Sequence, residues 1–288
     1  MRKIQNFNIV STFLCLWLTG YMPDNVEVYV ACFFILSLGL IHGANDIRII
    51  KKVYQHKNWS FVKFLALYVC IVLIVTIMFF SVPTIALFLF ILISGYHFGE
   101  QHFHNINSNN RFFRISLFTG YGCSVLFLLL ISNSSESITI IYHITNIHIT
   151  STIFAYALIV SLFVFGFSFI ILLKEIKQPL RELFNLLVFI VVFKTASLLW
   201  AFAIYFIIWH SLPSLLNQIK YLSLKVNKSS IMSYIKSSLL YWSISVLGLF
   251  IFFSFLVKES DSFSAVFFSF LAAITFPHVI VMTKIFKH

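Results

Sequence analysis

Four histidines lie inside long apolar runs, where an imidazole is unusual. They occur in the segments IHGAND, SGYHFGE, IIWHSLP and TFPHVI, as His42, His97, His210 and His278. A polar group in apolar surroundings is costly, so it usually faces the interior of a helical bundle and has a partner there. Any one of these histidines could be a hydrogen-bonded core residue, a proton relay, a haem ligand or a metal ligand. An all-imidazole metal site would suit iron, copper, zinc or nickel.

Two of these histidines are followed by a carboxylate at helical spacing. Asp46 comes four residues after His42, and Glu100 comes three residues after His97. Each pair therefore shares one face of a helix. A carboxylate in that position would hold the outer N–H of a ligating histidine. The alternative is that each carboxylate marks the point where its helix reaches headgroup water.

The composition is that of a membrane protein. Hydrophobic residues make up 60% of the chain, charged residues only 10%, and the mean hydropathy is +0.97, whereas soluble domains are roughly 25% charged. The start of the chain resembles a signal peptide, but no small-x-small cleavage site follows it, so we expect a first transmembrane helix. The four cysteines stand singly and indicate neither disulfides nor a thiolate site. These features predict one all-α transmembrane domain over residues 1–288.

The apolar runs predict the membrane spans. Runs of about 20 residues, enough to cross a bilayer, occur at 7–22, 26–47, 61–80, 83–101, 112–132, 152–173, 232–257 and 262–284. The apolar stretch 183–219 would be about 55 Å long as one helix, against a bilayer core of about 30 Å. We therefore expect two short spans or a hairpin there.

The distribution of charge predicts the orientation. A net charge of +11 is compatible with nucleic-acid binding, but the basic residues cluster in short connections between spans. If 183–219 crosses twice, one side of the membrane holds 18 of the 20 basic residues: Arg2, Lys3, Arg48, Lys51, Lys52, Lys57, Lys63, Arg111, Arg114, Lys174, Lys177, Arg181, Lys220, Lys225, Lys228, Lys236, Lys284 and Lys287. By the positive-inside rule, we predict a polytopic bundle in the inner (plasma) membrane with about ten crossings (8–10 helices), both termini cytoplasmic and no nucleic-acid partner. All four histidines then lie at a similar depth, which favours one shared centre.

Other histidine chemistry explains the pattern less well. Membrane desaturases use HxxxH and HxxHH clusters, whereas HFGEQHFH, with His102 and His104, has a different spacing. A bis-histidine haem would explain two of the four residues. A proton-coupled transporter would favour broken helices in matching halves of the chain, and outside 183–219 the sequence shows no such pair.

The histidine segments also resemble a known family. IHGANDIRI, SGYHFGEQHF, IIWHSLPSLL and TFPHVIVM, in that order, resemble the Brp/Blh family of membrane β-carotene 15,15′-dioxygenases from about residue 35 to the C-terminus. The resemblance implies cleavage of the central double bond of β-carotene, or of a related carotenoid, by O₂ within the lipid bilayer, giving two retinal molecules. It implies Fe²⁺ held by His42, His97 and His210, with His278 matching the family's Pro-His motif. No catalytic residue is expected beyond the metal ligands.

One position departs from the family pattern. The third motif often reads His-Ser-x-x-His, but here Ser214 stands in place of the second histidine. Either His278 completes a four-histidine site, or iron has three protein ligands, or the activity is lost or changed. In the last case the chain would be a non-catalytic carotenoid-binding, retinal-binding or regulatory relative, or a small transporter. Tyr96 and Trp209 are candidates for substrate contact, with ordinary packing as the alternative.

Overall fold

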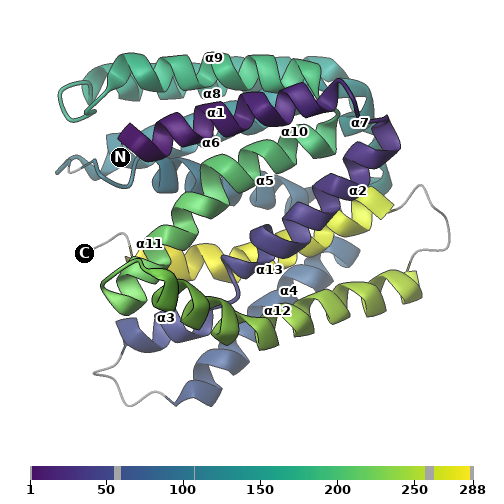
Figure 1. Cartoon of the computed structure of the whole chain (residues 1–288). Coiled ribbons are helices and arrows are strands. Elements are labelled where there is room, and N and C mark those ends of the chain that lie inside the picture. Colours follow the sequence, from purple (N-terminus) through teal and green to yellow (C-terminus); the bar gives the residue numbers. More distant parts are fainter. Residues whose placement is uncertain (1, 55–59, 107, 257–262, 286–288) are drawn as a thin grey trace. The chain divides into compact units, whose positions relative to one another are not determined.

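The computed structural model describes residues 2–54, 60–106, 108–256 and 263–285, and all regular elements in these ranges are helical (Figure 1). The predicted all-α class is therefore confirmed. The described helices that are long and apolar enough to cross a membrane are α4 (Phe61–Ser81), α5 (Pro83–His102), α6 (Arg111–Ser132), α8 (Ser151–Ile171), the continuous stretch Leu198–Ser223, α12 (Lys228–Leu256) and α13 (Phe263–Ile285). Ten crossings and cytoplasmic termini stay predictions. The predicted span boundaries at 257 and 262 lie outside the described residues.

The chain divides into two compact units. The first consists of Met1–Ser37, Ser94–Thr139 and Ile149–Pro213, and the second of Leu38–Ile93, Ile140–His148 and Ser214–His288. Each unit contains two of the four histidines. His97 and His210 belong to the first unit, and His42 and His278 belong to the second. The single domain expected over the whole chain stays a prediction.

The first unit is built around α6, which packs along α8 and also against α9 (Pro179–Thr195). Two glycines of α5, Gly95 and Gly99, lie one turn apart on the face toward α6. A Cβ at Gly99 would lie 1.9 Å from the carbonyl oxygen of Phe118, and a Cβ at Gly122 would lie 1.8 Å from that of Gly95. Small residues at this spacing let helix backbones touch. His97 lies midway between the two glycines and so points away from α6, since each residue turns a helix by about 100°.

The stretch 183–219 is divided between two helices, as predicted from its length. Helix α9 ends at Thr195, and α10 (Leu198–Ile204) begins after two extended residues. Carboxylates accept the first N–H groups of the new helix. Glu27 binds the N–H and hydroxyl of Ser197 (3.2 and 2.5 Å), and Glu136 binds the N–H of Leu198 (3.2 Å). Negative charge at a helix N-terminus is favourable, and this arrangement fixes the start of the helix that carries His210.

In the second unit, α13 packs against α4 and against the short helix α3 (Asp46–Val53), and α12 contacts α13. Short polar caps begin the long helices. Ser60 accepts a hydrogen bond from the N–H of Lys63 at the start of α4, and Asn227 and Ser230 bond reciprocally at the start of α12. Such caps satisfy amides that have no partner within the helix.

The helix expected over 26–47 ends before His42, which corrects the prediction. Helix α2 (Asp24–Phe34) continues as the π-helical segment η1 (Ile35–Gly39), and residues 42–45 form a turn before α3. Gly39, Gly43 and Asn45 all have low helix propensity and lie within seven positions. Their combined preference outweighs the apolar pattern that suggested a continuous span. His42 is therefore placed by a turn.

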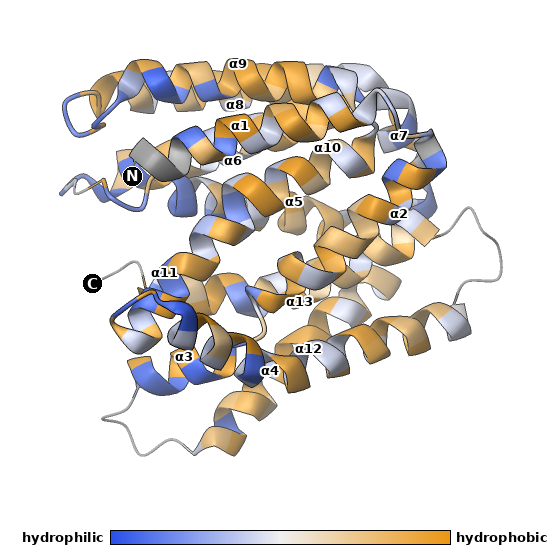
Figure 2. Cartoon of the chain, viewed as in Figure 1, coloured by the Kyte–Doolittle hydropathy of each residue, from blue (hydrophilic) through white to orange (hydrophobic). Residues whose placement is uncertain are grey.

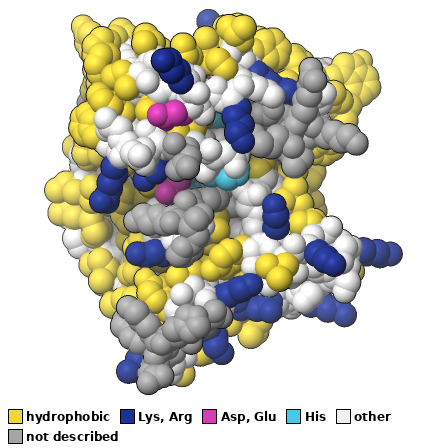
Figure 3. Space-filling view, turned by 90° about the vertical axis from the view of Figure 1, so that its left-hand side faces the viewer, with side chains coloured by type: hydrophobic (Ala, Val, Ile, Leu, Met, Phe, Trp, Pro, Cys, Tyr) yellow, Lys and Arg dark blue, Asp and Glu magenta, His cyan; other side chains and the backbone are white. Residues whose placement is uncertain are grey.

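The surface supports a membrane environment. Helices in both units are hydrophobic along most of their length, and polar residues gather at their ends and connections (Figure 2). Large apolar side chains are exposed on helices such as α8, where Phe163 is 73% and Ile170 is 71% exposed. Extensive exposed apolar surface of this kind indicates lipid contact in a protein with several spans. Lys and Arg side chains are spread among hydrophobic side chains over the face shown in Figure 3.

Candidate metal centre

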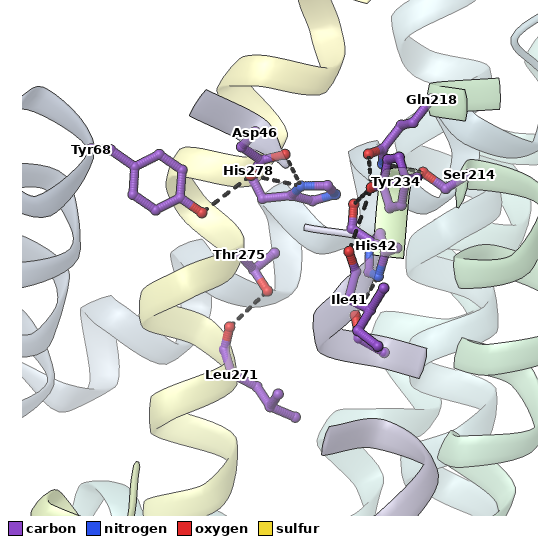
Figure 4. Close-up of polar contacts among 11 residues, drawn as sticks. Ile41, His42, Asp46, Tyr68, Ser214, Gln218, Tyr234, Leu271, Thr275 and His278 are labelled. Atoms are coloured by element: carbon purple, nitrogen blue, oxygen red, sulfur yellow. Dashed lines mark hydrogen bonds and ion pairs between the residues drawn. The ribbon is translucent and has the colours of Figure 1, made fainter. Parts of the chain in front are cut away.

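His42 and His278 meet inside the second unit (Figure 4). Their ring centroids are 4.7 Å apart and the rings are perpendicular, and the two residues are 4% and 5% exposed. His42 lies in the turn before α3, and His278 follows Pro277 within α13. A Cβ at Gly43 would lie 3.4 Å from Nδ1 of His278. Gly43 therefore lies beside the His278 ring, at a distance where an added Cβ would make an ordinary van der Waals contact.

Hydrogen bonds indicate which nitrogen of each ring is available to a metal ion. Nδ1 of His42 bonds to the carbonyl of Gly39, and Nδ1 of His278 lies 3.0 Å from both carboxylate oxygens of Asp46. In the neutral form, a ring that donates through Nδ1 carries its lone pair on Nε2. Nε2 is therefore the atom through which either ring could bind a metal ion, as is usual when the other nitrogen is held by a carbonyl or carboxylate.

Asp46 is the residue that orients His278. Its carboxylate is 1% exposed and also accepts a hydrogen bond from the hydroxyl of Tyr68 on α4 (3.1 Å; Figure 4). The sequence spacing associates Asp46 with His42, but the turn breaks the helix between them, and the carboxylate bonds to the histidine of α13. Tyr68 was missed by the sequence reasoning. The only signal for it was a hydroxyl within the apolar run FVKFLALYVC.

The first unit contains the other two histidines as a second pair. His97 of α5 and His210 have ring centroids 4.8 Å apart, and they are 1% and 2% exposed. Phe98 packs edge-on against His210 (4.7 Å), and Phe206 stacks on it (5.5 Å). His210 lies in the π-helical segment η2 (Tyr205–Ser211), which widens the helix by one residue per turn. Pi-helical turns are rare and occur frequently at functional sites.

The remaining predicted site residues have identifiable partners. The Tyr96 hydroxyl donates to Glu100 (2.7 Å), and Glu100 is 4% exposed, so its carboxylate does not mark a contact with headgroup water. The indole of Trp209 donates to the hydroxyl of Thr12 (2.9 Å) and packs edge-on against Phe189. A role for Glu100 beside His97, and for Tyr96 or Trp209 in substrate contact, stays a prediction.

A separate polar cluster in the first unit explains His102. Its Nε2 lies 2.5 Å from the carboxylate of Glu182 at the start of α9, and Tyr121 of α6 stacks on its ring. Asn185 donates to the same carboxylate (3.0 Å). From the sequence, His102 was considered only for its spacing from His97 and His104, and Glu182 was missed as its partner. The cluster links α5, α6 and α9 through part-buried hydrogen bonds and ring stacking, contacts that support the fold.

The donor set suits a transition metal. Each unit contains two buried imidazoles, and in the second unit Nδ1 of both rings is engaged in a hydrogen bond, so that Nε2 is the nitrogen available to a metal ion. Neutral imidazole is a ligand for iron, copper, zinc and nickel, whereas magnesium and calcium prefer oxygen. The residues present therefore fit the iron that the family resemblance implies.

Comparison with known proteins identifies the family. A family model described as beta-carotene 15,15'-dioxygenase matches residues 33–286, a range that includes all four histidines. A search of curated proteins and a search of solved structures each gave no match. The match covers most of the chain and agrees with the resemblance seen in the histidine motifs. The chain therefore belongs to the β-carotene 15,15′-dioxygenase family.

Proposed function

We propose that this chain is an iron-dependent membrane dioxygenase that cleaves the central 15,15′ double bond of β-carotene, or of a closely related carotenoid, with O₂. The proposal is supported by the buried imidazole pairs in a chain of this family. The reaction is balanced without a further reductant. One C=C and one O=O bond break and two aldehyde C=O bonds form, so that each retinal receives one oxygen atom.

We propose His42, His97, His210 and His278 as the ligands of Fe²⁺. The chemistry that bound iron would supply is the one-electron reactivity through which O₂ reacts with a closed-shell polyene. In His42 and His278 the ligand atom would be Nε2, because Nδ1 of each ring is held by a hydrogen bond. Asp46 retains the proton of His278 on Nδ1, and the Gly39 carbonyl does the same for His42. Ser214 is not needed as a ligand in this proposal.

The surroundings of the histidines suit a water-free reaction. Phe98 and Phe206 contact the ring of His210, and each of the four histidines is at most 5% exposed. Excluding water protects reactive intermediates from side reactions. Both β-carotene and O₂ are soluble in the apolar core of a membrane, so neither substrate would need an aqueous route. We further propose that the chain resides in the inner (plasma) membrane with both termini cytoplasmic.

The test is expression in a β-carotene-producing bacterium, followed by pigment extraction and iron analysis of the purified protein. We expect loss of β-carotene, formation of retinal, and iron bound close to one per chain. His97→Ala should abolish both retinal and iron, whereas the control His143→Ala, at an exposed position of α7 (Ser134–Thr145), should abolish neither. Retained β-carotene without bound iron would instead indicate a non-catalytic binding protein, a regulatory relative or a small transporter.

A further inference from the structure

Helix α12 is mostly exposed, yet its buried residue Tyr234 contacts the His42 turn. In the most apolar part of α12 only 11% of the residues are buried, against 78% in the most apolar part of Leu198–Ser223. Two of its buried residues, Tyr234 (3% exposed) and Ser238 (0%), lie one turn apart near its N-terminal end. In a helix with so little buried surface, a buried tyrosine hydroxyl requires a polar partner.

Three polar contacts join α12 to the turn that carries His42. The Tyr234 hydroxyl lies 3.1 Å from the carbonyl oxygen of His42 (Figure 4). The side chain of Asn45 donates to the carbonyl of Tyr234 (3.1 Å), and the hydroxyl of Ser237 donates to Asn45 (2.8 Å). The turn is therefore held on both sides of Gly43, which leaves its backbone little freedom to move.

Two buried residues of α11 (Leu212–Ser223) orient the tyrosine hydroxyl. Gln218 Oε1 lies 2.7 Å from it, and Gln218 Nε2 lies 3.2 Å from the hydroxyl of Ser214. Gln218 and Ser214 are both 0% exposed. A tyrosine hydroxyl has one proton, so it cannot donate to both Gln218 and His42. Turning the amide of Gln218 by half a turn, which exchanges oxygen and nitrogen at nearly the same positions, gives a single direction of donation: Ser214 to Gln218, Gln218 to Tyr234, and Tyr234 to the His42 carbonyl.

We propose that Tyr234 is a positioning residue for His42: its hydroxyl, oriented by Gln218 and Ser214, fixes the backbone of the turn so that the His42 imidazole meets that of His278. The assignment of His42 as a metal ligand rests on the proposed function. The role of Tyr234 in restraining the turn that carries His42 rests only on the hydrogen bonds described above. Ser214 thereby acquires a role within this chain that is not metal ligation.

Tyr234→Phe removes the hydroxyl and keeps the ring, and Tyr241→Phe is the matched control on the same helix at a half-buried position. The first measurement is hydrogen–deuterium exchange of the peptide over 38–48 in metal-free protein. In that turn, the N–H groups of Gly43 and Ala44 bond to the carbonyls of Leu40 and Ile41. We expect the exchange rate of the 38–48 peptide to become at least about tenfold faster in Tyr234→Phe, because local opening of the backbone sets the rate of exchange. The exchange rates of peptides from α12 should be unchanged.

The second measurement is Co²⁺ affinity and the visible spectrum of the Co²⁺ protein. Loss of a residue that orients a ligand typically lowers metal affinity by about 10- to 100-fold, and a displaced imidazole also shifts the Co²⁺ absorption bands. Tyr241→Phe should reproduce the wild-type affinity and spectrum. Gln218→Leu should resemble Tyr234→Phe, and the double variant should be no worse than either alone because both act through one hydroxyl.

The two proposals fail in different ways. Wild-type protein that binds no metal would overturn the proposed function, and the exchange measurement would still decide the role of Tyr234. Unchanged exchange over 38–48 in Tyr234→Phe would overturn the positioning role, whatever the metal result. Faster exchange with unchanged Co²⁺ affinity and spectrum would also overturn it, because the hydroxyl would then support the turn without placing His42.

Discussion

Gly99→Ala should destabilise the protein through one backbone contact. The added Cβ would lie 1.9 Å from the carbonyl oxygen of Phe118, whereas a normal C···O contact is about 3.3 Å. Helices α5 and α6 would have to separate locally by about 1.4 Å to relieve the clash. A backbone carbonyl cannot rotate away, so we expect a cost near the upper end of the usual overpacking range, about 3 kcal/mol. Higher helix propensity of alanine would return about 1 kcal/mol, leaving a net loss of about 2 kcal/mol.

Gly166→Ala is the matched control, because it lies in α8, a helix packed on α6, and a Cβ there would meet no atom within 4 Å. It should be neutral or stabilising by about 0.5–1 kcal/mol. The assay is equilibrium unfolding of both purified variants in mixed micelles with increasing SDS. Equal stability of Gly99→Ala and wild type would show that α5 and α6 do not make the backbone contact on which the orientation of His97 depends.

Four further predictions concern the site and its supports. Asp46→Asn keeps the shape of the side chain but removes the charge beside Nδ1 of His278, so metal affinity measured by titration should fall by about 10- to 100-fold; unchanged affinity would contradict the orienting role. Ser214→His adds volume at a fully buried position and should cost about 1–3 kcal/mol of unfolding free energy; an unchanged free energy of unfolding would contradict tight packing around Ser214. Glu182→Gln and His102→Gln should show a coupling energy of about 0.5–3 kcal/mol in a double-mutant cycle, and additive effects would show that the two side chains do not interact. Removing iron with a chelator should lower the unfolding free energy by about 2.7 kcal/mol relative to protein with free iron at 100 times its dissociation constant; equal stability with and without iron would contradict binding to the folded state.

The long helices were predictable because a membrane span needs a long apolar run, and few other structures produce one. The division of 183–219 followed from length alone, since one helix of that length exceeds a bilayer. The break at Ala196 and Ser197 is placed by carboxylates far away in the sequence, Glu27 and Glu136. Nothing in the local sequence identifies those partners.

The site was predictable in its residue types and less so in its contacts. A buried imidazole in an apolar run is conspicuous, so His97 and His278 could be identified one at a time. The partner of Asp46 could not be identified, because a hydropathy pattern does not reveal the four-residue turn between His42 and Asp46. Tyr68, Gln218 and the other hydrogen-bonding side chains around the histidines lie in runs whose composition resembles any other membrane helix. Their roles depend on pairings between distant segments.

The π-helical segment η2 has a consequence for insertions and deletions in this chain. Each π turn contains one residue more than an α turn, so the segment Tyr205–Ser211 stores an extra residue within an otherwise regular helix. Deleting one residue there would restore α-helical geometry and leave the residues that follow facing nearly the same way, whereas the same deletion in a regular α-helix would rotate them by about 100°. Gln218 would still face Tyr234, but the wider turn that carries His210 would be lost. A single missing residue in this segment would therefore mark a homologue whose helix is not widened at this histidine.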